Sequence, residues 1–394
     1  MCINAFLHGD LEEEVYMKLP PGFVSSKPNQ VCKLNKALYG LKQAPRCWFS
    51  KLTKALLEFG FKQNRLDYSL FTLHRNNTTL FVLVYVDDLI IGGDNSALIS
   101  EFKEHLHRSF HMKDLGELRY FLGIEVLRSK EGIYLSQRKY ALDIVSECGL
   151  LGSKPVDTPM EQYHNLGRDN GPFYTELAQY RRLVGRLVYL AITRPELNYP
   201  VHILAQFLHK PRQKHWDAAV RLVRYLKGLP GQGILLSATS DLALSAFSDS
   251  DWAACPLTRR SLTGYIVMMG NSLVSWKTKK QPTVSRSSAE AEYRAMAMTC
   301  SELKWMIGVM DSLGIRQLFP IPFHCDSKAA IHRPVNLNQS PRGPPHLTRR
   351  GVVQVERFEK IKSRVRVRVK TIFCREGAGW WILICGYPPT RKIK

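Results

Sequence analysis

The sequence lacks long apolar runs, and its N-terminus lacks the basic start of a secretory signal. The longest unbroken apolar runs, such as Leu80 to Val86, fall far short of the ~20 residues that span a bilayer. Three consecutive acids, Glu12 to Glu14, come before any long apolar core, which argues against a signal peptide. We therefore expect no transmembrane helix and a cytoplasmic or nuclear location.

Cysteine pairs of the metal-binding and redox kinds are also absent. The nine cysteines form an odd set scattered from Cys2 to Cys385, and no two are spaced as C-x-x-C. This pattern argues against both a disulfide framework and a zinc ribbon. The sequence predicts reduced, mostly buried thiols.

Acidic residues are scarce relative to basic ones. The 394 residues carry 56 Lys and Arg against 34 Asp and Glu, a formal net charge of +22. Such an excess favours a polyanionic partner, nucleic acid or an anionic membrane surface, although a merely basic soluble surface has the same balance. The apolar share of 45% and the charged share of 23% are typical of globular chains and argue against wholesale disorder. The length of 394 residues predicts about two or three domains.

The pattern of apolar residues predicts an α+β fold in successive segments. Residues 1–128 hold a helical stretch at 47–59 and β-rich runs at 79–86 and 89–91. Residues 129–165 hold a hairpin candidate at Lys130-Glu131-Gly132, an amphipathic helix at 138–148 and the start of a turn-rich linker. Residues 166–240 hold helical stretches at 180–190 and 215–226, separated by Pro195, Pro200 and Pro211. Residues 241–335 hold strand-like runs at 242–247, 264–268 and 273–276, and then a helical stretch at 289–313.

The tail, residues 336–394, differs from the rest. From Pro341 to Lys394 it has 14 Lys and Arg against three Asp and Glu, and arginine alternates with valine from Arg364 to Val369. A frameshift or a gene-model artefact is one interpretation. A basic nucleic-acid-binding strand is the alternative, because alternation places the arginines on one face.

Two adjacent acids, Asp87 and Asp88, interrupt the apolar stretch from Phe81 to Gly93. A buried, uncompensated carboxylate is costly, so the pair should lie at an exposed strand end or bind a cation. The flanking residues predict a β-hairpin with the acids at its tip. An ordinary Asp-Asp turn is one interpretation. The other is a metal site for phosphoryl transfer, because carboxylate oxygens hold Mg²⁺.

An ordered set of motifs surrounds this acid pair. They are Ala5-Phe6-Leu7-His8-Gly9-Asp10-Leu11, Pro20-Pro21-Gly22-Phe23, Leu38-Tyr39-Gly40-Leu41-Lys42-Gln43-Ala44-Pro45-Arg46, Tyr85-Val86-Asp87-Asp88, Met112-Lys113-Asp114-Leu115-Gly116, Phe121-Leu122-Gly123-Ile124-Glu125, Thr193-Arg194-Pro195 and Leu222-Val223-Arg224-Tyr225-Leu226-Lys227-Gly228. In this order they resemble the reverse transcriptase of copia-type retrotransposons. The resemblance covers roughly residues 3–332. It implies a partial palm (1–128), a thumb-like segment and linker (129–165), a helical connection (166–240) and a ribonuclease H-like mixed-sheet domain (241–335).

The resemblance assigns expected roles in the first segment. Asp87 and Asp88 correspond to the palm acids that bind catalytic Mg²⁺, with Mn²⁺ as a substitute. Gly40, Gln43 and Pro45 lie in a turn and helix start that lines the incoming nucleotide and template, although a simple helix N-terminus fits the same residues. Lys113 could place a cation near the leaving pyrophosphate or be an ordinary surface lysine.

One departure from the family pattern bears on polymerase activity. The family has another palm Asp that would fall at or just upstream of Met1, and Asp10 does not replace it by position. Because proteins supply only a few Mg²⁺ ligands, we expect little or no polymerase activity from the chain as given.

A second set of acids resembles the ribonuclease H domain of the same elements. It lies within Phe247-Ser248-Asp249-Ser250-Asp251-Trp252, Ser285-Arg286-Ser287-Ser288-Ala289-Glu290-Ala291-Glu292-Tyr293 and Cys325-Asp326-Ser327. The family acids fall on Asp249, Glu292 and Asp326, which would bind Mg²⁺ on two strands and a helix. Asp251 shares the strand face of Asp249 and is a reserve candidate. Taken singly, these acids could be strand-end turns, a solvated helix face or a helix N-cap.

The helix that carries Glu292 should be capped by the serine run Ser285 to Ser288. A fourth acid expected near the end is absent, because no Asp occurs after Asp326. The stretch Pro345 to Gly351 resembles the family segment only superficially.

These inferences favour a fragment of an RNA-directed DNA polymerase with a ribonuclease H domain that cleaves RNA–DNA hybrids. The implied partners are an RNA template, a DNA primer, the hybrid and deoxynucleotides, with no membrane. A catalytically inactive nucleic-acid-binding remnant is the alternative, because phosphate contacts need charge rather than metal geometry. An unstable pseudogene product whose truncated palm cannot close its core is a third hypothesis.

Overall fold

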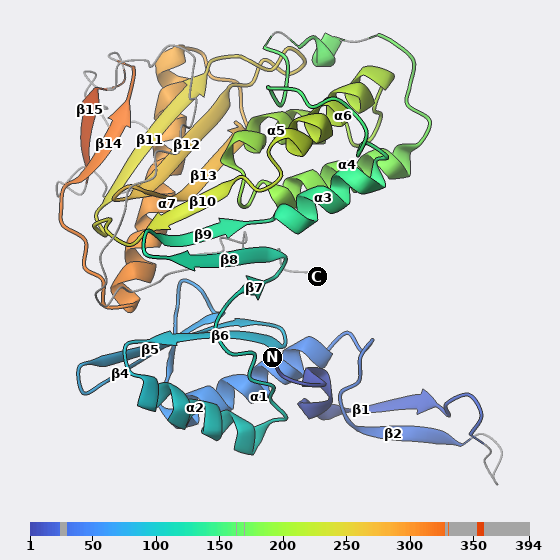
Figure 1. The fold of residues 1–394 in the computed structure, drawn as a ribbon, viewed down its shortest axis with the longest axis vertical. Coiled ribbons are helices and arrows are strands. Elements are labelled where there is room, and N and C mark those ends of the chain that lie inside the picture. The colour runs from blue at the N-terminus through green and yellow to red at the C-terminus, as the bar shows by residue number, and fades with distance from the viewer. Residues whose placement is uncertain (24–29, 163, 169, 328–329, 331–352, 358–394) are drawn as a thin grey trace. The chain divides into compact units, whose positions relative to one another are not determined.

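The computed structural model describes residues 1–23, 30–162, 164–168, 170–327, 330 and 353–357, and the chain forms two compact units (Figure 1). Among the described residues, Met1–Leu118 and Ile307–Arg316 form the first unit, and Arg119–Met306 with residues 317–327, 330 and 353–357 form the second. The arginine-valine alternation of the tail and the Pro345–Gly351 stretch lie outside the described residues. No helix among the described residues is long and apolar enough to cross a membrane.

The first unit is built on a four-stranded antiparallel sheet of order β3-β4-β5-β6. Its strands are β3 (Lys62–Gln63), β4 (Leu70–Arg75), β5 (Thr78–Tyr85) and β6 (Asp88–Gly93). The helices α1 (Ala44–Phe59) and α2 (Ser96–Ser109) pack against the sheet face that buries Leu80, Val82 and Val84. The helix and strands expected in residues 1–128 are confirmed, with the helix starting three residues earlier.

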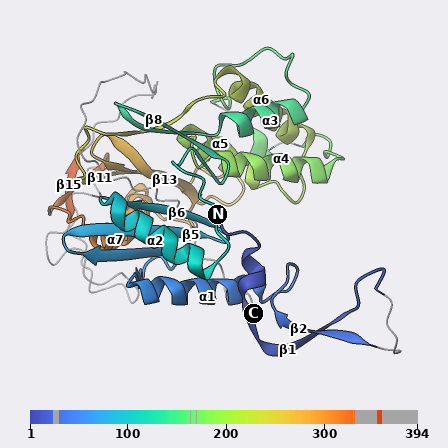
Figure 2. The ribbon, with the colours of Figure 1, turned by 60° about the horizontal axis from the view of Figure 1, so that its bottom comes forward.

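Local signals set the ends of these helices. At the end of α1, Gly60 has φ +111°, a left-handed conformation that glycine adopts without strain, and its amide donates to the Leu56 and Leu57 carbonyls. At the start of α2, the Asn95 side chain accepts a hydrogen bond from the Leu98 amide. A short 3₁₀ helix, Ala5–His8, precedes the hairpin of β1 (Asp10–Lys18) and β2 (Val31–Lys36), which extends away from α1 (Figure 2).

The second unit begins with an antiparallel sheet of order β10-β9-β8-β7 and a group of helices. The strands are β7 (Tyr120–Phe121), β8 (Ile124–Ser129), β9 (Gly132–Ser136) and β10 (Gly233–Ser237). The helices are α3 (Arg138–Glu147), α4 (Leu177–Leu190), α5 (Asn198–Ala205) and α6 (Gln213–Gly228), with 3₁₀ turns at Leu166–Arg168 and Pro195–Leu197. The hairpin expected at Lys130-Glu131-Gly132 is confirmed, because Ser129 pairs with Gly132.

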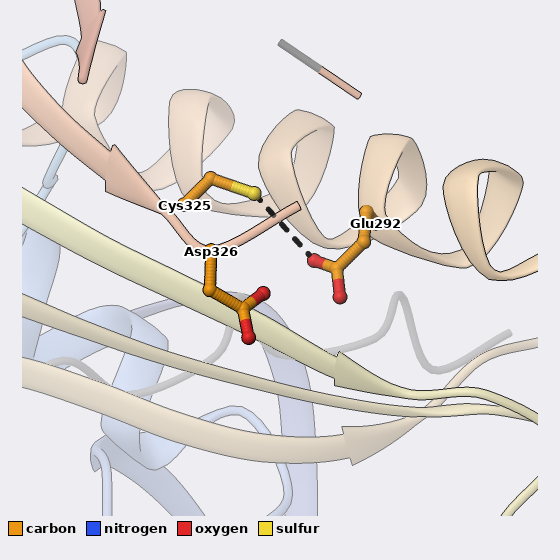
Figure 3. Close-up of side chains that lie close together, drawn as sticks. All are labelled: Glu292, Cys325 and Asp326. Atoms are coloured by element: carbon orange, nitrogen blue, oxygen red, sulfur yellow. Dashed lines mark hydrogen bonds between the residues drawn. The ribbon is translucent and has the colours of Figure 1, made fainter. Parts of the chain in front are cut away.

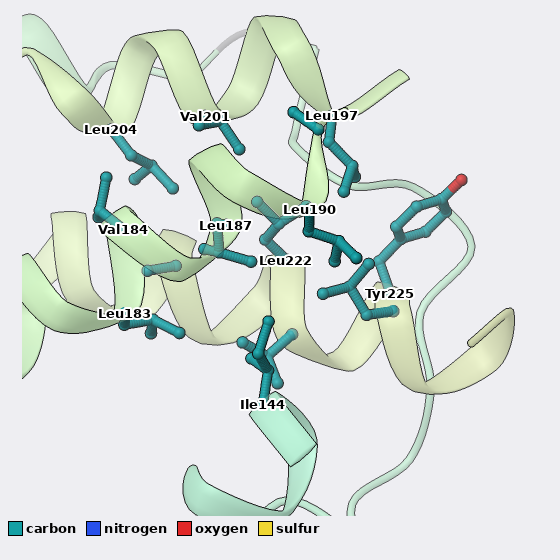
Figure 4. Packing of buried hydrophobic residues seen from close by; sticks show 14 of the residues in the cluster. Ile144, Leu183, Val184, Leu187, Leu190, Leu197, Val201, Leu204, Leu222 and Tyr225 are labelled. Atoms are coloured by element: carbon teal, nitrogen blue, oxygen red, sulfur yellow. The ribbon is translucent and has the colours of Figure 1, made fainter. Parts of the chain in front are cut away.

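One apolar core joins α3 to α4, α5 and α6 (Figure 4). Ile144 of α3 packs with Leu187 of α4, Leu204 of α5 and Leu222 of α6, all at most 1% exposed. The strand β10 also returns to pair with β9 along its whole length. Residues 129–165 and residues 166–240 therefore share both a core and a sheet.

The Thr193-Arg194-Pro195 motif ties the end of α4 to the end of α6. The Arg194 side chain is 1% exposed and forms an ion pair with Glu196, with Nε and Oε1 2.6 Å apart. Its Nη1 donates to the Leu229 carbonyl at 2.9 Å, and its guanidinium lies over the Tyr225 ring. A buried charge needs such partners, so this motif has a structural role.

The second unit ends with a five-stranded mixed sheet of order β13-β12-β11-β14-β15. The strands are β11 (Leu244–Asp251), β12 (Leu262–Met269), β13 (Ser272–Lys280), β14 (Ile321–Cys325) and β15 (Val353–Arg357). The first three are antiparallel, whereas β14 runs parallel to β11 and β15 parallel to β14. The helix α7 (Ser288–Ser312) separates β13 from β14 in sequence and contacts the sheet through a Ser275–Glu302 hydrogen bond.

Candidate functional site

In the first unit, the acid pair lies at the tip of the β5–β6 hairpin. Tyr85 pairs with Asp88, so Val86 and Asp87 form a two-residue turn, as the sequence predicts. Val86 has φ +53°, which is unusual for a β-branched residue and costs of order 1–3 kcal/mol. The chain therefore holds the two carboxylates in a conformation that the local sequence alone does not favour.

Two hydrogen bonds to backbone carbonyls hold this turn. The indole Nε1 of Trp48, on α1, donates to the Val86 carbonyl at 2.6 Å. The Cys2 amide donates to the Asp87 carbonyl at 2.6 Å. Trp48 is 1% exposed and Cys2 is fully buried, so both donors are fixed by packing and stabilise the strained turn from two sides.

The electrostatics of the turn suit a cation. Partial burial raises the pKa of Asp88, and the adjacent charge of Asp87 raises it further. Two like charges on neighbouring residues repel, and a nearby positive ion relieves that repulsion.

Asp10 does not join this acid pair. Its carboxylate forms an ion pair with Lys51 at 2.8 Å, and the hydrogen bond from Lys51 lowers the pKa of Asp10.

The remaining predicted residues of the first unit lie on segments that hold this turn. Gly40 has φ +98° in the turn before α1, Gln43 is the residue before the helix, and Pro45 is in its first turn. The same helix carries Trp48. The Lys113 amide donates to the Met1 carbonyl, next to the Cys2 amide that binds Asp87.

In the second unit, the predicted acids come from β11, α7 and the end of β14. Buried and exposed side chains alternate along β11, so Asp249 and Asp251 lie on the same, exposed face, as expected. Pairing of β11 with β14 ends at Ser248 and Cys325. Beyond that point the Ser250 amide donates to Glu292 Oε1 at 3.2 Å. Asp326 follows the last residue of β14.

Glu292 is the centre of this group. It is 5% exposed, and burial raises its pKa to about 7, with the charges of Asp249 and Asp326 adding to the shift. Hydrogen bonds from the Ser250 amide and the Cys325 thiol oppose this shift. The charges of Asp249 and Asp326 therefore both act on Glu292, and a carboxylate oxygen of Asp326 lies within 4.8 Å of one of Glu292.

A cysteine that the sequence motifs do not single out completes the cluster. The Cys325 thiol lies 3.8 Å from Glu292 Oε2 (Figure 3). Ligand atoms of Glu292, Cys325 and Asp326 all lie within 4.8 Å of one another, and Asp249 stands outside this tight group. The only available signal in the sequence was the position of Cys325 immediately before Asp326 at a strand end.

Gln281 is a second residue that was missed, and it aligns the elements that carry the acids. Its side chain is 1% exposed. Its Nε2 lies within hydrogen-bond distance of Ser250 Oγ on β11, Thr263 Oγ1 on β12 and the Ala291 carbonyl on α7, at 2.9 to 3.2 Å. Because Ala291 precedes Glu292, Gln281 sets the position of that carboxylate against the sheet.

The start of α7 is capped as predicted. The Ser287 hydroxyl accepts a hydrogen bond from the Glu290 amide at 3.2 Å, and Glu290 in turn accepts from the Arg286 amide at 2.8 Å. This reciprocal arrangement fixes the first turn of the helix. Ser285 belongs to the Gln281 network instead, because its hydroxyl donates to Gln281 Oε1.

Comparison with known proteins agrees with the motifs. A family described as reverse transcriptase (RNA-dependent DNA polymerase) matches residues 2–162. The Pol polyprotein of transposon RE1 from Arabidopsis thaliana is 46% identical over 330 residues, which are 84% of this chain and 22% of the polyprotein. That of transposon TNT 1-94 from Nicotiana tabacum is 37% identical over 83% of this chain and 25% of the polyprotein. The chain belongs to the reverse transcriptase family of copia-type transposon Pol polyproteins.

The chain spans about a quarter or less of the Pol polyproteins that it matches. A putative transposon Ty5-1 protein from Saccharomyces cerevisiae is 32% identical over 76% of this copia-type chain and is itself covered over 99% of its length. Among solved structures, a prototype foamy virus protease–reverse transcriptase aligns with 88% of this chain and 43% of that chain. Its sequence identity is 12% and its TM-score 0.17, too low to support a conclusion about the fold.

Replacing Gln281 with Met tests its role in aligning β11, β12 and α7. The nearly isosteric change leaves buried partners without their hydrogen bonds, so we expect the free energy of unfolding to fall by about 2 to 4 kcal/mol. Urea denaturation measures the change. The matched control is Lys279→Met on the exposed face of β13, which should cost at most about 0.5 kcal/mol. Equal losses in the two variants would contradict the role of Gln281.

Replacing Glu292 with Gln tests the raised pKa of that carboxyl group. Because the folded state holds a proton up to about pH 7, whereas the unfolded chain releases it near pH 4.5, the wild-type protein loses stability as the pH rises through this window. In EDTA, we expect the wild type to lose about 2 to 3 kcal/mol more than Glu292→Gln between pH 5 and pH 8.

The control for this measurement is Glu290→Gln on the same helix. A hydrogen bond from the Arg286 amide lowers the pKa of Glu290, so its contribution to stability changes only at lower pH. The Glu290 variant should keep the wild-type pH dependence between pH 5 and pH 8. A wild-type profile that matches that of Glu292→Gln would show that the Glu292 pKa is not raised.

Proposed function

We propose that this chain is part of a polyprotein that carries out RNA-directed DNA synthesis, that it has little or no polymerase activity by itself, and that it cleaves the RNA strand of an RNA–DNA hybrid. In this proposal residues 241–335 are the ribonuclease H-like domain, residues 1–128 a partial palm, 129–165 a thumb-like segment and 166–240 a connection. The observation that carries the nuclease proposal is the convergence of Asp249 and Asp326 on the buried Glu292. Its support is the order of the elements: an acid on β11, one on α7 and one at the end of β14.

The donor set of the second unit fits a hard divalent cation. Carboxylate oxygens are the ligands that Mg²⁺ and Mn²⁺ prefer. The charges of Asp249 and Asp326 raise the pKa of Glu292, and a nearby positive ion would relieve that repulsion. Asp249, Glu292 and Asp326 would hold the ion there, and Asp87 and Asp88 would do so in the first unit. When bound, such an ion would activate water for attack and would neutralise charge on phosphate oxygens.

The protein side chains supply orientation and control of protons. The Ser250 amide and the Cys325 thiol bind the two oxygens of Glu292 and fix the plane of its carboxylate. Because its pKa is about 7, Glu292 must release a proton to act as a ligand. We therefore propose that cleavage rises with pH between about 6 and 8.

In the first unit, we propose that the turn between β5 and β6 presents Asp87 and Asp88 to the primer end and the incoming deoxynucleotide. Gly40, Gln43 and Pro45 would line the nucleotide and the RNA template at the start of α1, where exposed Gly40 has open space around its Cα. Lys113 would supply a cation for the leaving pyrophosphate. The support is that two donors bind the turn: Trp48 of α1 and the amide of Cys2. The residue before Cys2, Met1, in turn accepts a hydrogen bond from the Lys113 amide.

A second candidate is nucleic-acid binding without catalysis. The net charge of +22 favours it, because phosphate contacts require positive charge but no metal geometry. Binding of this kind should weaken steeply with salt and should not need Mg²⁺.

One assay tests both activities of the full chain. We use Mg²⁺ and an RNA template annealed to a DNA primer, with a separate label on each strand. We expect Asp249→Asn to reduce RNA cleavage by about 100-fold or more, since metal stabilisation is worth several kcal/mol. Primer extension, if formed, should be lost in Asp87→Asn.

The matched controls are Asp241→Asn, an exposed acid before β11, and Asp94→Asn, an exposed acid after β6. Both should keep wild-type activity. Cleavage that persists in Asp249→Asn would overturn the nuclease proposal. Salt-sensitive hybrid binding with neither product, unchanged in both Asn variants, would favour the inactive binder.

A further inference from the structure

The second unit contains a pocket away from the acid cluster. It is bordered by α5, the loop around Gly167 and the β11–β12 loop, and its cavity measures about 70 Å³. That volume is enough for several waters, at roughly 10–15 Å³ each, or for one small organic group. Its apolar wall is formed by Ile203, Phe207, Pro256, Leu257 and Leu262. A small, partly apolar molecule can therefore enter.

Cys255 and Lys280 meet in this pocket. The Lys280 ammonium lies 3.6 Å from Cys255 Sγ and donates to Gln206 Oε1 at 2.7 Å. Gln206 thus holds the lysine beside the sulfur. The other titratable side chains that line the pocket are His164, Tyr199, Asp251 and Arg260.

The thiol also lies in a favourable electrostatic environment. Burial alone would raise the pKa of Cys255, but hydrogen bonds from the Thr258 hydroxyl and from the Thr258 and Leu257 amides, together with the Lys280 charge, lower it below its usual value. The opposite holds for Cys2, Cys148, Cys300 and Cys325, in which burial raises the thiol pKa. The thiolate is the reactive form of cysteine.

We infer that the Cys255–Lys280 pocket is a covalent modification site for small, soft electrophiles, with Cys255 as the nucleophile and Lys280 as one of the groups that stabilise its thiolate. With a haloacetamide, the sulfur forms a bond to the methylene carbon, the carbon–halogen bond breaks and halide leaves. The thiol proton goes to solvent when the thiolate forms, so atoms and charge balance.

Peptide-resolved alkylation of the full chain tests this inference. We treat the native protein with limiting iodoacetamide at pH 7 and measure the labelling of each cysteine by mass spectrometry. Cys32 and Cys47, which are also half-exposed, are the internal references. Cys255 should react at least about threefold faster than either, because a lower pKa raises the thiolate fraction more than it reduces nucleophilicity.

The same measurement in urea removes the pocket without a mutation. There the three thiols should react at similar rates. If Cys255 reacts no faster than Cys32 and Cys47 in the native protein, or keeps its advantage in urea, the inference is wrong.

Two variants separate the role of Lys280 from general packing. Lys280→Gln should reduce the advantage of Cys255 by about 1.5- to 2-fold, because the hydrogen bonds from Thr258 and Leu257 remain. Lys280→Arg should retain most of the advantage because the charge remains. The matched control is Lys279→Gln, the neighbouring exposed lysine of β13, which should leave the rate unchanged. An unchanged rate in Lys280→Gln would contradict the role of Lys280.

Discussion

The second unit is organised around one electrostatic constraint, a glutamate buried beside two further acids. A carboxylate in such a place is costly unless it is protonated, hydrogen-bonded or bound to a cation. The chain meets part of this cost through the Ser250 amide, which becomes available because the pairing of β11 with β14 stops at Ser248. Gln281 then fixes α7 against β11 and β12, so that Glu292 cannot turn away. Sheet register, helix position and site geometry therefore depend on one another.

In the first unit, the acid pair is positioned by hydrogen bonds to the backbone of its turn. Asp87 and Asp88 are consecutive residues in a hairpin, and the turn is maintained by donors that contact the backbone rather than the carboxylates. Val86 would not favour its left-handed conformation in isolation, so the packing of Trp48 and Cys2 stabilises it. The carboxylates of Asp87 and Asp88 remain half-buried.

Much of the fold followed from local pattern. The alternation along β11 predicted the shared face of Asp249 and Asp251, and apolar spacing predicted α1, α3, α4, α6 and α7. The sequence pattern does not indicate α5, because Pro200 suggests a break between helices, whereas proline is tolerated in the first turn of a helix. The five-residue strand β10 was missed because its partner β9 lies about a hundred residues earlier, and such pairing leaves no local periodic signal. The cysteines were expected to be mostly buried, yet five of the seven described are half-exposed.

The candidate acids could be selected from the sequence only as an ordered set, since each acid alone has an ordinary structural explanation. Gln281 and Cys325 could not be selected, because their roles arise from contacts between segments that are distant in the chain. Family membership and the Asp87–Asp88 hairpin rest on sequence motifs, whereas the alignment of Glu292 rests on tertiary packing.

The central claim is that Asp249, Glu292 and Asp326 form one site for a divalent cation. The most direct test is a crystal of the full chain soaked in Mn²⁺ and measured for anomalous scattering. The claim predicts an anomalous peak within about 2.3 Å of carboxylate oxygens from all three residues. A peak elsewhere, with these three carboxylates bound only to protein and water, would contradict it.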